Sequence, residues 1–272
     1  MTLNKISLLK NPIQEYAWGS KTAIQSLLGE PGAIGKPMAE LWMGAHPKAP
    51  SQIIIDGEWQ SLNQVINKDP ESILGKSVAE KFSNQLPFLF KILAAERPLS
   101  IQVHPTMEQA QEGFARENDI GIPLDAPNRN YRDANHKPEI LCALTPFQGM
   151  KGFRKVEEIL DLMDRLSLAS LSGEIDLLRK EPNSYGLKSF FSALMRMDKG
   201  RRNEVTDEAV KTAEKFADKD EVCRWVAKLN KEYPGDIGIL SPIILNMVLL
   251  EPGEAMYLPA GEIVSSALVS TG

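Results

Sequence analysis

The chain has 272 residues and a formal net charge of −5, with 43% hydrophobic and 25% charged residues, which is typical of a globular protein with a core of ordinary size. Its lysines and arginines are scattered rather than clustered, which argues against nucleic acid or an anionic membrane as the main partner. The N-terminal residues contain no apolar run typical of a signal peptide, and the most apolar window, residues 237–250, is too short to span a bilayer. We therefore expect a cytoplasmic protein.

Residues 1–150 are rich in proline and glycine and contain short apolar runs that predict strands. These runs lie at residues 52–57, 86–95, 99–105 and 139–147. Two short helices are expected, near residues 60–67 and 106–116. The second begins with Pro105 and Thr106, as a capped helix prefers.

Beyond residue 150 the apolar residues recur at helical intervals in three segments, 154–171, 185–197 and 206–233. Thr206 is the expected cap of the third. From about residue 241 the pattern typical of strands returns, with a turn at Glu251–Glu254. A parallel α/β protein would alternate strands and helices throughout, so this order predicts a helical insertion within a mainly β architecture.

The two cysteines, Cys142 and Cys223, have no CxxC spacing and lie in apolar, periodic stretches. We expect both to be buried free thiols, which fits a reducing compartment.

The stretch LSIQVHP, residues 99–105, alternates apolar and polar side chains, so Gln102 and His104 share one face of the predicted strand. Two such side chains can converge on one ion, since imidazole is an ordinary metal ligand and an amide oxygen is a reasonable hard donor. The alternative is a half-exposed strand whose polar side chains are simply solvated.

A second polar cluster immediately precedes a predicted strand and holds Asp133, Asn135, His136, Lys137 and Glu139. Glu139 has the chemistry of a carboxylate ligand or a general base, and Lys137 that of an anion-binding group, for example for phosphate. The alternative is an ordinary charged loop. The sequence contains no P-loop, GxGxxG or GxSxG pattern, which argues against nucleotide binding and serine hydrolase chemistry.

Two further segments each carry a tryptophan with polar neighbours. Trp18 lies in one, and Trp42 lies in the other with Glu40 and His46. Glu40 and His46 are candidates to line a pocket, whereas buried aromatic side chains often serve the core alone.

Taken together, six motifs in chain order resemble the type I mannose-6-phosphate isomerase (phosphomannose isomerase) family of zinc-dependent cupin enzymes. The motifs are YAWGSKTA (16–23), PMAELWMGAHP (37–47), LPFLFKILAAERPLSIQVHP (86–105), NYRDANHKPE (130–139), LTPFQGM (144–150) and LEPGEAMYLPAGE (250–262). The resemblance implies a cupin-type β-barrel, incomplete here, with an inserted helical domain.

The resemblance also implies a division of the chain into domains. Residues 1–150 would form the N-terminal part of the catalytic cupin, residues 151–235 the helical insertion and residues 236–272 returning cupin strands. The family's second C-terminal cupin would be absent, so we expect a truncated member of the family.

The family interconverts mannose 6-phosphate and fructose 6-phosphate, a reaction that feeds mannose metabolism and GDP-mannose biosynthesis. By resemblance, Gln102, His104 and Glu139 are zinc ligands. We accordingly expect a zinc cofactor, a small sugar phosphate as the partner, no nucleic-acid or membrane partner, and a monomer.

The resemblance implies roles for other residues around the same pocket. Ser100, Lys137 and Trp18 match substrate-binding positions, with Ser100 and Lys137 near the phosphate. Lys137 and Glu40 match positions that take part in catalysis.

The chain departs from the family pattern at Val264, where the fourth zinc ligand, a histidine, is expected. The resemblance ends near Glu262, and the family's segment with a catalytic arginine is not found before Gly272. Two alternatives to an active isomerase therefore stay open. One is a catalytically impaired remnant that binds metal or sugar phosphate, and the other is a structural cupin that binds neither.

Overall fold

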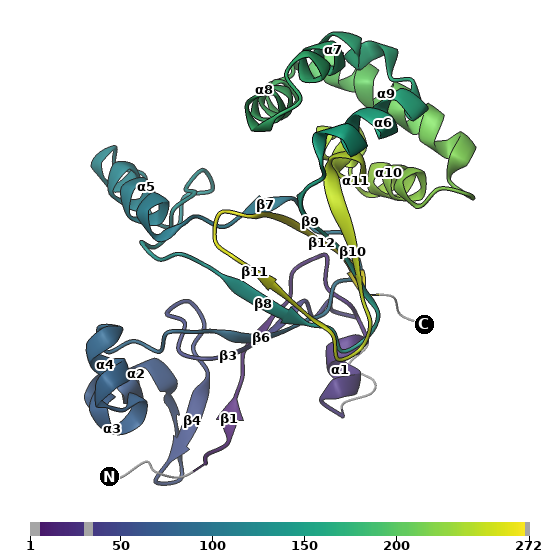
Figure 1. Ribbon diagram of the computed structural model, residues 1–272. Coiled ribbons are helices and arrows are strands. Elements are labelled where there is room, and N and C mark those ends of the chain that lie inside the picture. The colour runs from purple at the N-terminus through teal and green to yellow at the C-terminus, as the bar shows by residue number, and fades with distance from the viewer. Residues whose placement is uncertain (1–5, 30–34, 270–272) are drawn as a thin grey trace. The chain divides into compact units, whose positions relative to one another are not determined.

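The computed structural model describes residues 6–29 and 35–269, and of residues 266–269 only the backbone (Figure 1). The chain separates into two compact units, residues 1–97 and 98–272, and each is described by itself. No helix within the described ranges is long and apolar enough to cross a membrane.

The first unit contains two small antiparallel sheets. One has the strand order β1 (Leu9–Lys10), β4 (Gln52–Ile55), β5 (Glu58–Ser61), and the other β2 (Ile13–Gln14), β3 (Glu40–Met43), β6 (Phe90–Leu93). Asp56 and Gly57 join β4 to β5 with positive φ angles of 51° and 86°, the conformation of a tight hairpin turn. The helices of this unit are α1 (Ala23–Leu27), α2 (Leu62–Lys68), α3 (Pro70–Leu74) and α4 (Lys76–Lys81).

The second unit contains two further antiparallel sheets. One has the order β10 (Leu245–Leu250), β9 (Phe147–Phe153), β12 (Ile263–Val269), β7 (Gln102–Val103), and the other pairs β11 (Ala255–Leu258) with β8 (Glu139–Cys142). The strands of the described residues thus form four separate sheets and no closed barrel. The mainly β architecture with a helical insertion is confirmed, and the barrel is indeed incomplete.

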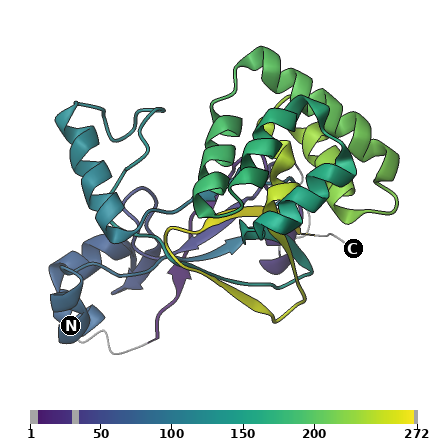
Figure 2. The ribbon, with the colours of Figure 1, turned by 45° about the horizontal axis from the view of Figure 1, so that its top comes forward.

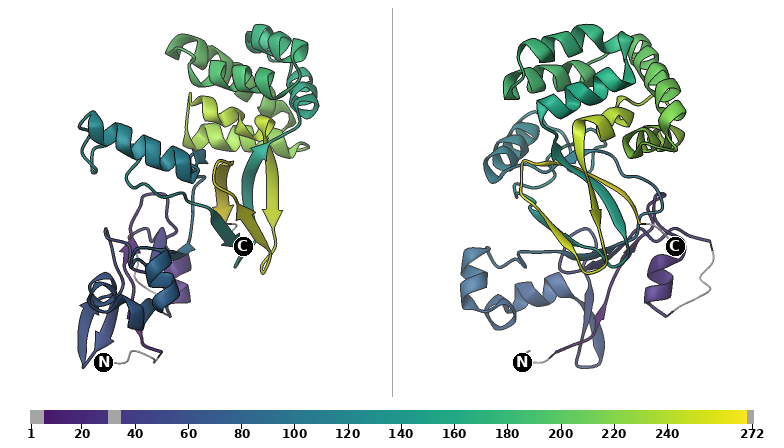
Figure 3. Two further views of the ribbon diagram at one scale, coloured as in Figure 1. Left: turned by 60° about the vertical axis from the view of Figure 1, so that its left-hand side comes forward. Right: turned by 45° about the vertical axis from the view of Figure 1, so that its right-hand side comes forward.

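The helical block of the second unit lies together at one end of strands β9 and β10 (Figures 2 and 3). It comprises α6 (Val156–Leu166), η1 (Ala169–Leu171), α7 (Ser172–Lys180), α8 (Ser184–Met195), α9 (Lys199–Phe216), α10 (Glu221–Glu232), η2 (Ile237–Leu240) and α11 (Ser241–Ile244). The apolar faces predicted from the helical spacing meet in one continuous core, which includes Ile159, Leu171, Val205 and Ile243, all fully buried.

Helix α5 (Met107–Asp119) is separate from this block (Figure 2). It begins as predicted, because the Thr106 side chain accepts a hydrogen bond from the N–H of Gln109, whose own side chain accepts one from the N–H of Thr106. This reciprocal cap fixes the start of the helix two residues after His104.

The strand expected over residues 99–105 is formed only at Gln102–Val103, and three further details of the sequence-based prediction were wrong. Residues 206–233 form two helices, capped by Asp198 and Asp220, whereas Thr206 lies buried inside α9 and donates to the carbonyl of Asn203. Residues 139–147 are not one strand, since β8 ends at Cys142 and β9 begins at Phe147.

The third error concerns the cysteines. Cys142 is exposed, because it shares the outer face of β8 with Ile140, which is 75% exposed. Cys223 is buried as expected, and burial raises the pKa of its thiol to about 11.

Candidate metal centre

His104 and Glu139 meet although 34 intervening residues separate them in the sequence. Their Nε2 and Oε1 atoms lie 3.4 Å apart, and the two side chains are 23% and 47% exposed. Two ligands bound at about 2.0–2.2 Å to one tetrahedral zinc ion are separated by roughly 3.4 Å. The nitrogen and the carboxylate oxygen therefore have both the chemistry and the spacing to bind a single ion.

Gln102 belongs to β7, and His104 follows the end of this strand by one residue. If the extended backbone continues to His104, the two side chains share one face. In the antiparallel register, Gln102 pairs with Val264 of β12, and the carbonyl of His104 accepts a hydrogen bond of 2.7 Å from the N–H of Gly261. These backbone contacts align the strand that carries Gln102 and His104 with β12.

Glu139 is positioned by the neighbouring sheet. It opens β8 and pairs with Leu258 of β11. Because directly paired residues share a face, Glu139 lies beside Leu258, just as Gln102 lies beside Val264. Leu258 and Val264 belong to one buried apolar cluster. This cluster contains residues of both sheets and therefore packs them together. Glu139, at the start of β8, consequently lies close to His104, just after β7.

Val264 occupies the position at which the fourth ligand is expected by resemblance. It is only 7% exposed and packs in the apolar cluster beside Gln102. In the part of the chain that the structure describes, no three His, Cys, Asp or Glu side chains gather in one metal-binding group. The candidate donors are therefore one imidazole, one carboxylate and the amide of Gln102.

The two predicted phosphate-binding residues flank these donors in the sequence. Ser100 is exposed and precedes Gln102 by two residues, and Lys137 precedes Glu139 by two. The Lys137 ammonium is about half exposed and forms an ion pair of 3.0 Å with Asp133. An exposed pair of this kind exchanges readily, so the ammonium remains able to turn to an anion.

Glu40 and Trp18 belong to the first unit. Glu40 is buried on β3, accepts a hydrogen bond of 2.6 Å from Trp42 Nε1 and lies 3.6 Å from the Lys91 ammonium. Trp18 is half-buried, with its ring 5.7 Å from that of Tyr16. Both residues thus have structural partners of their own within this unit.

The contact between Lys91 and Glu40 was missed by the sequence-based reasoning. Lys91 lies on β6 opposite Trp42, and its ammonium is 5.1 Å from the centre of the indole ring. The available signal was a single lysine inside the apolar run LPFLFKILAA.

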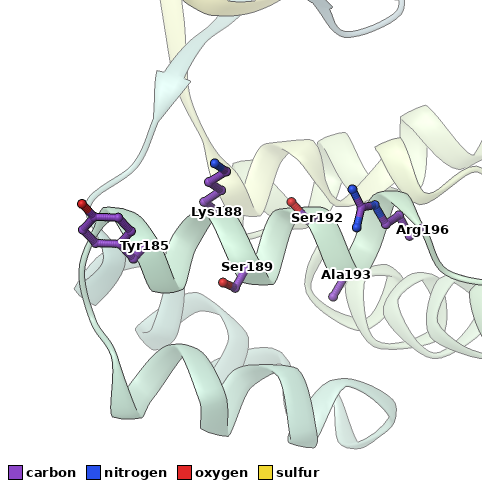
Figure 4. A pocket seen from close by; sticks show the side chains of 6 residues that line it. All are labelled: Tyr185, Lys188, Ser189, Ser192, Ala193 and Arg196. Atoms are coloured by element: carbon purple, nitrogen blue, oxygen red, sulfur yellow. The ribbon is translucent and has the colours of Figure 1, made fainter.

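A separate hollow of about 600 Å³ lies along one face of α8 (Figure 4). It is lined by Tyr185, Lys188, Ser189, Ser192, Ala193 and Arg196. These residues recur at intervals of three or four and therefore form one side of a single helix. None of the candidate residues lines this hollow, so it is not part of the candidate centre.

The sequence matches two family patterns: phosphomannose isomerase type I, catalytic domain, over residues 6–156, and phosphomannose isomerase type I, helical insertion domain, over residues 168–245. The mannose-6-phosphate isomerases of Salmonella typhimurium and Escherichia coli are each 44% identical to the chain and cover 92% of it. The human mannose-6-phosphate isomerase is 37% identical and covers 96% of the chain.

Solved structures agree with this likeness. The mannose 6-phosphate isomerase of Salmonella typhimurium bound to its substrate fructose 6-phosphate and zinc superposes with a TM-score of 0.88 at 42% identity, covering 96% of this chain. A zinc-bound mannose 6-phosphate isomerase gives a TM-score of 0.86 at the same identity. The chain spans 63–65% of the length of these relatives.

Proposed function

Because the chain belongs to the type I phosphomannose isomerase family, we propose that it interconverts mannose 6-phosphate and fructose 6-phosphate at a zinc site formed by Gln102, His104 and Glu139. The observation that carries the proposal is the 3.4 Å approach of His104 Nε2 to Glu139 Oε1. Further support comes from the relatives, since a Salmonella structure contains both fructose 6-phosphate and zinc.

The three donors suit a divalent ion that must still bind substrate. One carboxylate leaves a net positive charge on the site, while the imidazole and the amide are neutral ligands. A bound zinc ion supplies Lewis acidity, which stabilises negative charge as it develops on a sugar oxygen. Glu139 is aligned by its pairing in β8, and the backbone of His104 is held by the hydrogen bond from the N–H of Gly261, so both donors are placed before any ion arrives.

The phosphate of the substrate is assigned to Ser100 and Lys137. A phosphate oxygen would replace Asp133 as the partner of the Lys137 ammonium, and the exposed hydroxyl of Ser100 would donate a hydrogen bond to it. Binding energy from this remote group orients the sugar at the ion. The part of Lys137 in catalysis is proposed on the resemblance alone.

Two residues of the first unit enter the proposal on the resemblance alone. Glu40 is assigned a part in catalysis and Trp18 a part in substrate binding. Glu40 already accepts a hydrogen bond from Trp42, so its carboxylate is held in place within the first unit.

A second candidate function is binding of zinc and sugar phosphate with little turnover. The observation that favours it is Val264, a buried apolar side chain beside Gln102 where the family pattern has a histidine. Three protein ligands suffice for catalytic zinc in many enzymes, so this substitution lowers metal affinity without abolishing the site.

A coupled assay of the purified chain with mannose 6-phosphate separates the two candidates. We expect turnover that rises with added zinc, disappears with a chelator and is lost in His104→Ala. Stoichiometric zinc without turnover would favour the binding function. Absence of bound zinc by elemental analysis, in protein refolded with excess metal, would contradict both.

We further propose a cytoplasmic location, a monomeric state and a place in the supply of GDP-mannose. Two free thiols, Cys142 and Cys223, support a reducing compartment. Light scattering of the purified chain tests the monomer, and a mass of twice 30.1 kDa would contradict it.

A further inference from the structure

A buried ion pair joins α5 to the loop that leads to Glu139. Glu117, in the last turns of α5, lies 3.3 Å from the guanidinium of Arg129, and the two side chains are 6% and 0% exposed. Buried charges of this kind require several hydrogen bonds in addition to their mutual attraction. Here the additional hydrogen bonds come from the backbone and side chains of α5 and the loop after it.

Glu117 binds the backbone of the loop directly. Its carboxylate accepts hydrogen bonds from the N–H of Asn130 at 3.1 Å and from the N–H of Tyr131 at 2.8 Å. Two consecutive amides are thereby held against the helix. Six residues later the same loop reaches Lys137, and two residues after that Glu139.

Arg129 connects the end of α5 and the start of the loop to the middle of the loop. Its guanidinium donates to the carbonyls of Tyr131 at 2.7 Å and Ile122 at 2.5 Å, and to the side-chain oxygen of Asn118 at 2.7 Å. The guanidinium donates from three nitrogens in a planar fork and so reaches three acceptors that are spread apart, whereas a lysine donates from a single nitrogen. The loop is therefore closed on itself as well as attached to α5.

Helix α5 packs closely against this loop. A Cβ atom at Gly113 would lie 2.5 Å from the ring of Tyr131, so the absence of a side chain there permits the contact. The other end of the helix is capped by Thr106, two residues after His104. Helix α5 thus connects the segment that contains His104, just after β7, to the loop that leads into β8 and Glu139.

We propose that Glu117 and Arg129 are positioning residues that set the place of Lys137 and Glu139 relative to His104. They contact neither the metal nor the sugar, and they act by fixing the loop on α5. This inference rests on the proposed function for its consequence at the metal. Its geometric part can be tested in the metal-free chain.

The chain offers a matched control in the helical block. Glu208 also accepts hydrogen bonds from two consecutive backbone amides, those of Ala169 at 3.1 Å and Ser170 at 2.9 Å. Its hydrogen bonds among the described residues go to Ala169 and Ser170, both in the helical block and away from the loop and strands of the candidate metal centre. Glu117→Gln and Glu208→Gln therefore remove the same kind of contact at two different places.

Zinc affinity is measured by competition with a chromophoric chelator. Residues that orient metal ligands typically change affinity by about 10–100-fold. We expect a weakening of this size in Glu117→Gln and a change of less than about twofold in Glu208→Gln, with excess zinc restoring occupancy. Arg129→Lys should also weaken zinc binding. If Glu117→Gln does not fold, the zinc affinity of Arg129→Lys tests the proposal in its place. Wild-type affinity in a folded variant of either position would overturn the proposal.

Hydrogen exchange of the metal-free chain provides the second measurement. In Glu117→Gln, peptides covering residues 132–141 should exchange several-fold faster than in the wild type, and in Glu208→Gln they should not. Faster exchange confined to residues 129–131 would overturn the positioning role. If the wild type binds no zinc, the proposed function fails, and the exchange data alone decide whether the ion pair positions Glu139.

Discussion

The helical block and the strands around the candidate metal centre are stabilised in different ways. In the helical block the buried side chains form one continuous apolar core from α6 to α11. Around the candidate metal centre the two sheets share a buried cluster that comprises six of the residues whose side chains are described. The second region relies on backbone register, a buried ion pair and polar contacts to the loop before β8.

The two regions therefore differ in what their contacts contribute: one mainly stabilises the fold, and the other mainly fixes the positions of particular side chains. A large apolar core contributes free energy of unfolding but is tolerant of small shifts, because the hydrophobic effect is non-directional. Hydrogen bonds and strand register contribute less free energy but define distances between particular atoms. A site that needs two donors about 3.4 Å apart belongs with the second kind of contact.

Matched leucine truncations should show the largest difference between the two regions. Leu171→Ala removes a fully buried side chain from the helical core and should lower the free energy of unfolding by about 3–5 kcal/mol while zinc affinity stays unchanged. Leu258→Ala, in the small cluster, should cost about 2–3 kcal/mol and also weaken zinc binding about tenfold, since Leu258 pairs with Glu139.

Urea denaturation gives the stability of each variant, and chelator competition gives its zinc affinity. Equal zinc affinities in the two variants would break the comparison, because the small cluster would then have no part in placing Glu139. A larger loss of stability in Leu258→Ala would contradict the ranking of the two cores.

The helical block was largely predictable from the sequence because its signal is local. Helix α6 (Val156–Leu166) was expected within residues 154–171, since its apolar residues recur along one face. The error at Thr206 is also local, because Asp198 and Asp220, and not Thr206, cap the two helices of this segment. Aspartate at the N-cap is at least as favourable as threonine.

The candidate metal centre was less predictable from pattern alone. The alternation in residues 99–105 extends over seven positions, yet only Gln102 and Val103 pair, because the length of a strand depends on its partner β12. Nothing local connects His104 to Glu139, which the resemblance alone brought together. The ion pair of Glu117 with Arg129 carries no sequence signature, since its two members are 12 residues apart and face each other only after the loop folds back.

Restoring a histidine should strengthen the metal centre at some expense of the core. In Val264→His the new imidazole would lie beside Gln102, and we expect zinc to bind about tenfold more tightly, which corresponds to about 1.4 kcal/mol. The metal-free variant should be less stable than the wild type by about 1–3 kcal/mol, because a larger polar side chain replaces a buried valine.

The neighbouring residue provides the control for this change. Ile263 is equally buried but points to the opposite side of β12, where it packs in the helical core. Ile263→His should lose stability without any gain in zinc affinity. A gain in both variants would show that the new histidines bind zinc elsewhere, and a gain in neither would place Val264 out of reach of the metal.

The smallest expected effect concerns the acid stability of the two carboxylates that hold loops. The N–H of Tyr131 contributes most to lowering the pKa of Glu117, against the opposing effect of burial. Burial acts to raise the pKa of Glu208, but hydrogen bonds from Ser170 and Ala169 outweigh it and lower the pKa. Both groups therefore have a lower pKa in the folded chain than the ordinary value of 4.5.

A carboxylate with a lowered pKa stabilises the fold fully above its ordinary pKa, and this contribution is lost as the pH falls through its folded value. The free energy of unfolding should consequently fall less steeply below pH 4.5 in Glu117→Gln and in Glu208→Gln than in the wild type. Urea titrations at pH 3–6 measure these slopes, and slopes equal to the wild type would contradict the lowered pKa values. The two variants should behave alike in acid yet differ in zinc affinity. This comparison distinguishes the contact of Glu208, which only stabilises the helical block, from the contact of Glu117, which also positions the proposed ligand Glu139.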